Sequence, residues 1–278
     1  MADLIHSVQF YLAKNGRDSR PVDAYLYPYL FDFVFNHSLY RRLNLAGESC
    51  LHLIYGLKGF PQIITFNNNA GIPLDKFAEE MRNYFCYYAG FPDFEIGEQV
   101  GNQWATRKIL TFPLNLKSEN EIVIHKNPIL CLSIRNHPEI AEIGFSPGFM
   151  GGFSYVASHF TIETLMATHL IECLEIPVVD GFYGESPTGR YFYELLWMMK
   201  KKIQPLGIKL ASEGKRPYTI QTAMLLLLDR INMLDVDLFR SDLGAFFSTE
   251  NQIDQYLSSF QRSFSTAAEF YFQENIFI

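Results

Sequence analysis

The hydrophobic pattern of the chain changes after residue 157, and this change limits the folds that the chain can adopt. Between residues 93 and 135, β-branched and aromatic residues form short runs separated by turn-forming residues, which is typical of strands. From residue 158 onward, apolar residues recur with helical spacing. We therefore predict an α+β fold, with a mixed β-sheet in residues 1–157 and an all-helical domain in residues 158–278. The glycine-rich segment 145–157 is interpreted as the joint between the two domains.

A strand-helix-strand unit is predicted near the start of the sheet region. Residues 43–46 and 62–66 have the character of strands, and residues 49–56 read as a short helix between them. Residues 22–42 and 73–91, which flank this unit, have helical periodicity.

Composition and charge exclude several classes of function. The formal net charge of −7 and the pI near 5.5 give no global footprint for nucleic-acid binding and no DNA signature. The longest aliphatic run, residues 223–228, is too short to span a bilayer, so we expect a soluble cytoplasmic protein. The four cysteines and seven histidines show no spacing typical of zinc sites, and no metal site is predicted from spacing.

Several segments, taken in order, resemble the AbiEii-type nucleotidyltransferase toxins of type IV toxin-antitoxin systems. The resemblance runs from roughly residue 25 to residue 262, and its segments are "GES" at 47–49, "CLHLIYG" at 50–56, "FPQIITF" at 60–66, "ETLMATHLIECLE" at 163–175, "GRYFYELLW" at 189–197 and "DLFRSDLGAFF" at 237–247. It implies a polymerase-β-like nucleotidyltransferase domain followed by a helical domain. It also implies transfer of a nucleotide from a nucleoside triphosphate to an acceptor such as a tRNA end, with magnesium held by carboxylates.

The chain departs from the family pattern where carboxylates are expected. The two strand aspartates of the family fall on Ile63 and Thr65, and a later acidic position falls near Ser133. The family's lysine and the two aspartates of its later motif fall, in order, on His169, Tyr191 and Glu194. Only Glu194 keeps a carboxylate, so we expect a divergent member without the magnesium site and without a cofactor.

The turn at residues 47–49 differs from the family as well. The family has a pair of glycines before its serine or threonine, whereas this chain has Gly47, Glu48 and Ser49. A glutamate there would repel a triphosphate, because like charges a few ångströms apart cost on the order of 1 kcal/mol in water. The simpler interpretation is a helix start with a favourable acidic residue. The resemblance implies that a nucleotide, if bound, meets Gly47, Glu48, Ser49, His169 and Arg190.

Three hypotheses about function follow from these departures. The first is a catalytically degenerate relative that binds a nucleotide, a tRNA or a cognate protein partner. The second is an active nucleotidyltransferase whose acceptor is a tRNA or a protein and whose magnesium ligands are displaced, for example Glu48 and Glu194 with Asp75 or Asp180. The third is a structural module that shares only the fold.

A basic run, residues 200–202, ends one of the predicted helices. Positive charge complements the dipole at a helix C-terminus, which accounts for these lysines without a ligand. The alternative is an RNA-facing edge that also includes Arg190 and Lys209.

Overall fold

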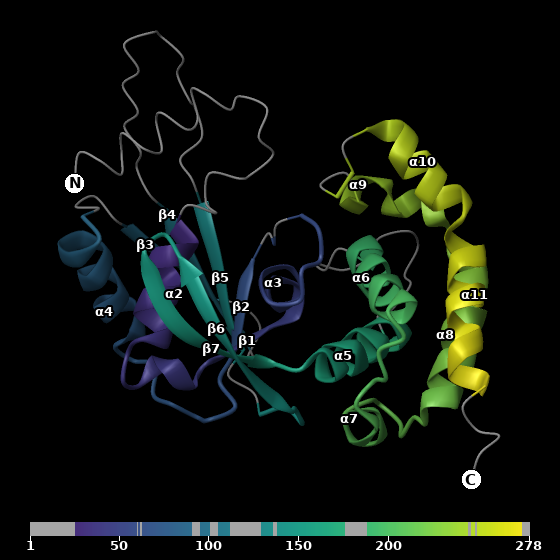
Figure 1. Ribbon diagram of the computed structural model, residues 1–278, viewed down its shortest axis with the longest axis horizontal. Helices are drawn as coiled ribbons and strands as arrows, with labels where there is room; N and C mark the ends of the chain where they lie inside the picture. The colour runs from purple at the N-terminus through teal and green to yellow at the C-terminus, as the bar shows by residue number, and fades with distance from the viewer. Residues whose placement is uncertain are drawn as a thin grey trace, which may run out of the picture. The chain divides into compact units, whose positions relative to one another are not determined.

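The computed structural model describes residues 26–59, 61, 63–90, 95–100, 105–111, 129–135, 138–175, 188–243, 246–247 and 249–273. They form two compact units (Figure 1). The first contains the described residues up to Cys50 and those within Phe60–Pro138 and Gly144–His159. The second contains Leu51–Gly59, Glu139–Ile143 and the described residues from Phe160 onward. The predicted domains 1–157 and 158–278 remain a prediction, and each observed unit consists of several chain segments.

A seven-stranded mixed sheet forms the centre of the first unit. Its strands are β1 (Asn44–Ala46), β2 (Ile64–Asn67), β3 (Glu95–Val100), β4 (Ala105–Thr111), β5 (Ile129–Arg135), β6 (Ile143–Met150) and β7 (Phe153–Phe160). The strand order is β3-β4-β5-β2-β1-β7-β6. β1 is antiparallel to β2 and parallel to β7, while β2 is parallel to β5. The predicted α+β class with a mixed sheet is confirmed.

Helix α2 (Tyr27–Phe35) packs on the sheet through aromatic side chains. The ring of Phe35 lies 5.9 Å from that of Phe66 in β2 and 5.7 Å from that of Tyr155 in β7, between centroids. The prediction of one helix over residues 22–42 is wrong from Asn36 onward. The Nδ1 atom of His37 accepts backbone N–H groups of Leu39 and Tyr40, which ends the helical ladder before the short 3₁₀ helix η2 (Tyr40–Arg42).

The helix predicted in residues 73–91 is shorter than expected and changes its winding. It is α4 (Phe77–Asn83), which continues as the π-helix η3 (Tyr84–Tyr88). The phenol of Tyr84 donates a hydrogen bond to Asp32 at 2.5 Å, which ties this segment to α2.

The glycine-rich segment 145–157 is part of the sheet, so its interpretation as a joint is wrong. It belongs to the neighbouring strands β6 and β7, which are joined at Gly151 and Gly152. Both glycines have positive φ, which a tight turn requires and which other residues rarely adopt. Glycine here therefore marks a hairpin turn and not a domain linker.

The described elements of the second unit are mainly helices. They include α5 (Ile162–Glu175), α6 (Thr188–Lys200), α7 (Gly207–Ser212), α8 (Ile220–Met233), the 3₁₀ helix η4 (Val236–Phe239), α9 (Arg240–Leu243), α10 (Glu250–Ser258) and α11 (Phe260–Gln273). Thr219 and Thr222 form a reciprocal capping box at the start of α8. Ser259 lies between α10 and α11, and its hydroxyl donates to the carbonyls of Gln255 and Tyr256.

Among the described helices, none combines the length and the hydropathy needed to cross a membrane.

Candidate functional site

The turn predicted at residues 47–49 begins helix α3 (Gly47–Leu53), directly after β1. Gly47 has a φ of +58°, in the left-handed region that glycine adopts at low cost. A Cβ atom at this position would lie 3.8 Å from Cβ of Thr65, which is an ordinary contact distance. Backbone conformation, rather than space, therefore accounts for glycine at the start of α3.

The hydroxyl of Ser49 is used inside the fold. It donates to the carbonyl of Ala46 at 2.8 Å and accepts the backbone N–H of Thr65 at 3.0 Å. The side chain is fully buried. Ser49 therefore holds the first turn of α3 against β1 and β2, and its hydroxyl does not face solvent.

The strand positions that the resemblance predicts to correspond to carboxylates carry neutral side chains. Thr65 is half-buried on β2, and the sheet register sets it directly beside Ser133 of β5. Ile63 is half-buried and lies one residue before β2 begins at Ile64. Magnesium prefers several oxygen ligands that include carboxylates. The hydroxyls of Thr65 and Ser133 and the aliphatic side chain of Ile63 do not form such a ligand set.

A buried histidine–glutamate pair lies between α5 and α6 in the second unit. Nε2 of His169 is 2.5 Å from Oε2 of Glu194, and each side chain is 1% exposed. Nδ1 of His169 is 2.8 Å from the carbonyl oxygen of Leu165. A carbonyl oxygen accepts, so Nδ1 of His169 carries a hydrogen, and Nε2 donates to the carboxylate when the ring is charged.

The electrostatics of this pair agree with a charged histidine. Burial alone lowers the pKa of His169, but the hydrogen bond that Nε2 donates to Glu194 and the negative charge of Glu194 outweigh burial and raise the pKa. The other carboxylate oxygen of Glu194, Oε1, is buried and has no hydrogen-bond partner within the part of the chain that the structure describes. Tyr191 packs edge-on against His169, with 5.4 Å between ring centroids.

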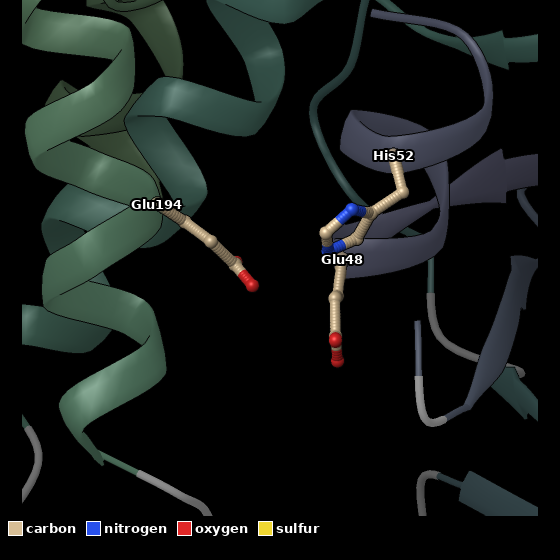
Figure 2. A group of neighbouring side chains, drawn as sticks. All are labelled: Glu48, His52 and Glu194. Atoms are coloured by element: carbon tan, nitrogen blue, oxygen red, sulfur yellow. The ribbon is translucent and has the colours of Figure 1, made fainter. Parts of the chain in front are cut away.

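His52 of α3 belongs to the same unit and faces Glu194 (Figure 2). Its ligand atom lies within 4.8 Å of a carboxylate oxygen of Glu194. Nδ1 of His52 is 2.9 Å from the carbonyl of Leu57, so Nδ1 carries the hydrogen and Nε2 bears the lone pair. Burial lowers the pKa of His52, which keeps the ring neutral.

Glu48 lies one helical turn before His52 on α3, and Figure 2 shows both side chains. The boundary between the units passes through this helix, so Glu48 is grouped with the first unit and His52 with the second. Residues four apart on a helix share a face, and the two side chains have ligand atoms within 4.8 Å of each other. Imidazole and carboxylate are ligand types that suit zinc-like divalent metals better than magnesium.

Positive groups already lie close to His52 and Glu194. Arg190 is buried on α6, and its guanidinium carbon lies 5.0 Å from the centroid of the Phe246 ring, against which His52 also stacks. The charge of Arg190 contributes to the low pKa of His52, although burial contributes more. With the raised pKa of His169, two basic side chains lie near Glu194, and their positive charge opposes the binding of a metal cation there.

The residues predicted from the resemblance therefore fall into two groups. Gly47, Ser49 and Thr65 come together in the first unit, and His169, Tyr191, Glu194 and Arg190 lie on α5 and α6 of the second. Asp75 is exposed in a turn before α4, and Asp180 lies outside the described residues. Sequence reasoning missed His52, since its only signal was its spacing of four from Glu48 on a predicted helix.

No model of a known protein family matches the chain, and no curated protein matches it.

Proposed function

We propose that the chain is a catalytically inactive relative of the AbiEii-type nucleotidyltransferases and that it acts by binding a partner. The observation that carries the proposal is the pairing of Thr65 with Ser133 on β2 and β5. If the resemblance holds, two positions that bear metal-binding carboxylates in the family lie side by side here and are neutral. Two magnesium ions cannot be held by hydroxyl groups alone, so nucleotide transfer through them is lost.

The state of the turn at α3 supports the same proposal. A serine that binds phosphate has to present its hydroxyl and nearby backbone N–H groups to the ligand. Ser49 instead directs its hydroxyl to Ala46 and Thr65. Glu48 adds a negative charge in the first turn of α3, where an anionic ligand would otherwise be favoured.

The helical positions that the resemblance assigns to the family motif, His169 and Glu194, also contribute to the packing of the helices. The one retained carboxylate, Glu194, is buried and pairs with His169, which occupies the family's lysine position. A carboxylate held by a charged histidine contributes to folding and is not available to activate an acceptor hydroxyl without breaking that pair. The partner that this relative binds would be a nucleotide, a tRNA or a cognate protein.

A transfer assay tests the proposal directly. Purified protein is incubated with each of the four labelled ribonucleoside triphosphates, total tRNA and magnesium or manganese. We expect no labelled tRNA and no labelled protein. Labelled product that disappears in the Glu194→Ala or Glu48→Ala variant would refute the proposal and favour an active enzyme with displaced carboxylates.

A further inference from the structure

A groove in the second unit is lined by positively charged and hydroxyl-bearing side chains. Its volume is about 530 Å³, within the range of small-molecule sites, and it lies between the C-terminal end of α6 and one face of α11. The lining includes Lys200, Lys202 and Arg262, together with Ser263, Thr266 and Phe270. No acidic residue contributes to this lining.

The three cations of the groove differ from other cations of the same unit. Lys209, for example, is buried and pairs with Glu139 and Glu213, and Arg240 pairs with two carboxylates on α10. Lys200, Lys202 and Arg262 are exposed, and none of them forms an ion pair with any residue that the structure describes. In a protein with a net charge of −7, three unpaired cations around one groove form a local site for negative charge.

Lys202 occupies a backbone position where glycine is usual. Its φ is +58°, and it directly follows the C-terminal turn of α6, where its N–H donates to the carbonyl of Met199 at 2.8 Å. Glycine is the common residue at such a helix end, because side chains disfavour positive φ. The lysine there extends its Nζ atom to 5.2 Å from the centroid of the Phe270 ring in α11. Its side chain thus crosses from the end of α6 to α11.

The helix dipole accounts for only part of this arrangement. Positive charge at the C-terminal end of α6 is favourable, which explains Lys200 and its neighbours without a ligand. It does not explain Arg262, which comes from the first turn of another helix. Lys201 makes a useful contrast, since its Nζ lies 4.3 Å from the Trp197 ring centroid and it does not line the groove.

We propose that this groove binds phosphate groups, with Lys200, Lys202 and Arg262 as the cationic contacts and the hydroxyls of Ser263 and Thr266 as donors. Arginine and lysine form short charge-assisted hydrogen bonds to phosphate oxygens, and hydroxyls complete the coordination. The phosphates come either from a free polyphosphate compound or from the backbone of a single RNA strand. Where the ligand carries a base, Phe270 beside the cations offers a surface on which that base stacks.

Binding of inorganic triphosphate to the full-length protein, measured by calorimetry at low ionic strength, tests the proposal. We expect saturable binding that is weakened about tenfold in Lys202→Gln and in Arg262→Gln, because each variant loses one charge-assisted contact. Lys201→Gln is the matched control: it removes the same charge from the same turn, and we expect less than about a twofold change. All three positions are exposed, so the variants are expected to fold.

A fluorescently labelled uridine oligonucleotide distinguishes the two sources of phosphate. Binding of this oligonucleotide that is weakened in the same two variants identifies an RNA strand as the ligand, and triphosphate binding without RNA binding identifies a free polyphosphate compound. For RNA, the slope of log K against log salt should fall by about 0.7 for each cation removed. Absence of saturable binding of either probe, or equal weakening by Lys201→Gln, would overturn the proposal. The transfer assay is unaffected by these outcomes, so this proposal and the proposed function fail separately.

Discussion

Replacing Glu194 by glutamine removes the charge of a buried carboxylate and keeps its shape, which tests whether the His169–Glu194 pair is ionised. Glutamine can still accept the hydrogen bond from Nε2 of His169 through its amide oxygen. The variant therefore loses the electrostatic attraction and retains packing. Burial, which lowers the pKa of His169, is then opposed only by the lesser effects of the Glu172 charge and the Leu165 carbonyl, and the neutral ring becomes more favourable.

The expected loss of stability depends on pH, with a definite sign. In the wild type the folded-state pKa of His169 is raised above its ordinary value of 6.5. The stability that the pair supplies is thus fully present below the unfolded pKa and is lost as pH rises through the folded pKa. Leaving a buried charge without its partner costs about 3–5 kcal/mol. We expect a loss of stability of this size at pH values below the pKa of the unfolded histidine. Above the folded pKa the difference should shrink to about 1 kcal/mol or less, the scale of one neutral hydrogen bond.

Thermal and urea unfolding of wild type and Glu194→Gln across this pH range provides the measurement. At about 2–4 °C per kcal/mol, the low-pH difference corresponds to a fall in Tm of roughly 6 to 20 °C. Glu269→Gln, at an exposed position on α11, is the control for charge removal and should change stability by less than about 0.5 kcal/mol. When His169 is already replaced by glutamine, the destabilisation caused by Glu194→Gln should no longer depend on pH. A destabilisation that is the same at every pH, or that grows as pH rises, would refute the assignment of a charged histidine.

Two further predictions concern the turn at α3. Ser49→Ala should destabilise the protein by about 2 kcal/mol in urea unfolding, because it leaves the backbone N–H of Thr65 without its acceptor and removes the donor to Ala46. Ser258→Ala, at an exposed position on α10, is the control. Equal losses of stability in the two variants would contradict the structural role of Ser49. The triple variant Glu48→Gly, Ile63→Asp and Thr65→Asp should gain magnesium-dependent triphosphate binding by calorimetry. The double aspartate variant and the wild type should not, apart from the groove binding that Lys202→Gln and Arg262→Gln weaken. Strong magnesium-dependent binding at the wild-type turn would show that Glu48 does not block it.

Sequence predicts best those parts of the fold that are determined by the residue pattern within one short segment. The strand-helix-strand unit from β1 to β2 is such a case: its alternating and helical patterns are short and are bounded by Gly47 and Gly56, both of which have positive φ. The helical spacing expected from residue 158 onward also has a local cause, and α5, α6 and α8 follow it. Local patterns failed at the hairpin of β6 and β7, where a cluster of glycines resembles a linker until the pairing of the strands is known.

The candidate site was less predictable because its partners are distant in sequence. His52 and Glu194 are brought together only when α3 residues join the helical unit, and spacing rules for metal or catalytic residues cannot detect such a pair. Burial also contradicts one interpretation of the basic residues. Lys209 and Arg190 looked like candidates for an RNA-facing edge, yet both are buried, and Lys209 is held by Glu139 and Glu213. A list of basic residues does not show which of them remain available to a ligand.

The segmented make-up of the two units has a consequence for folding during synthesis. Leu51–Gly59 leaves the ribosome early, but the helices with which it is grouped are made more than a hundred residues later. The first unit likewise lacks β6 and β7 until residues 144–159 have been made. Neither unit can be completed from one continuous stretch of nascent chain, so loop closure over long separations comes before the stabilising contacts. Folding should therefore be slow for a chain this rich in helix, and apolar segments of the early sheet strands would depend on chaperones until the later helices emerge.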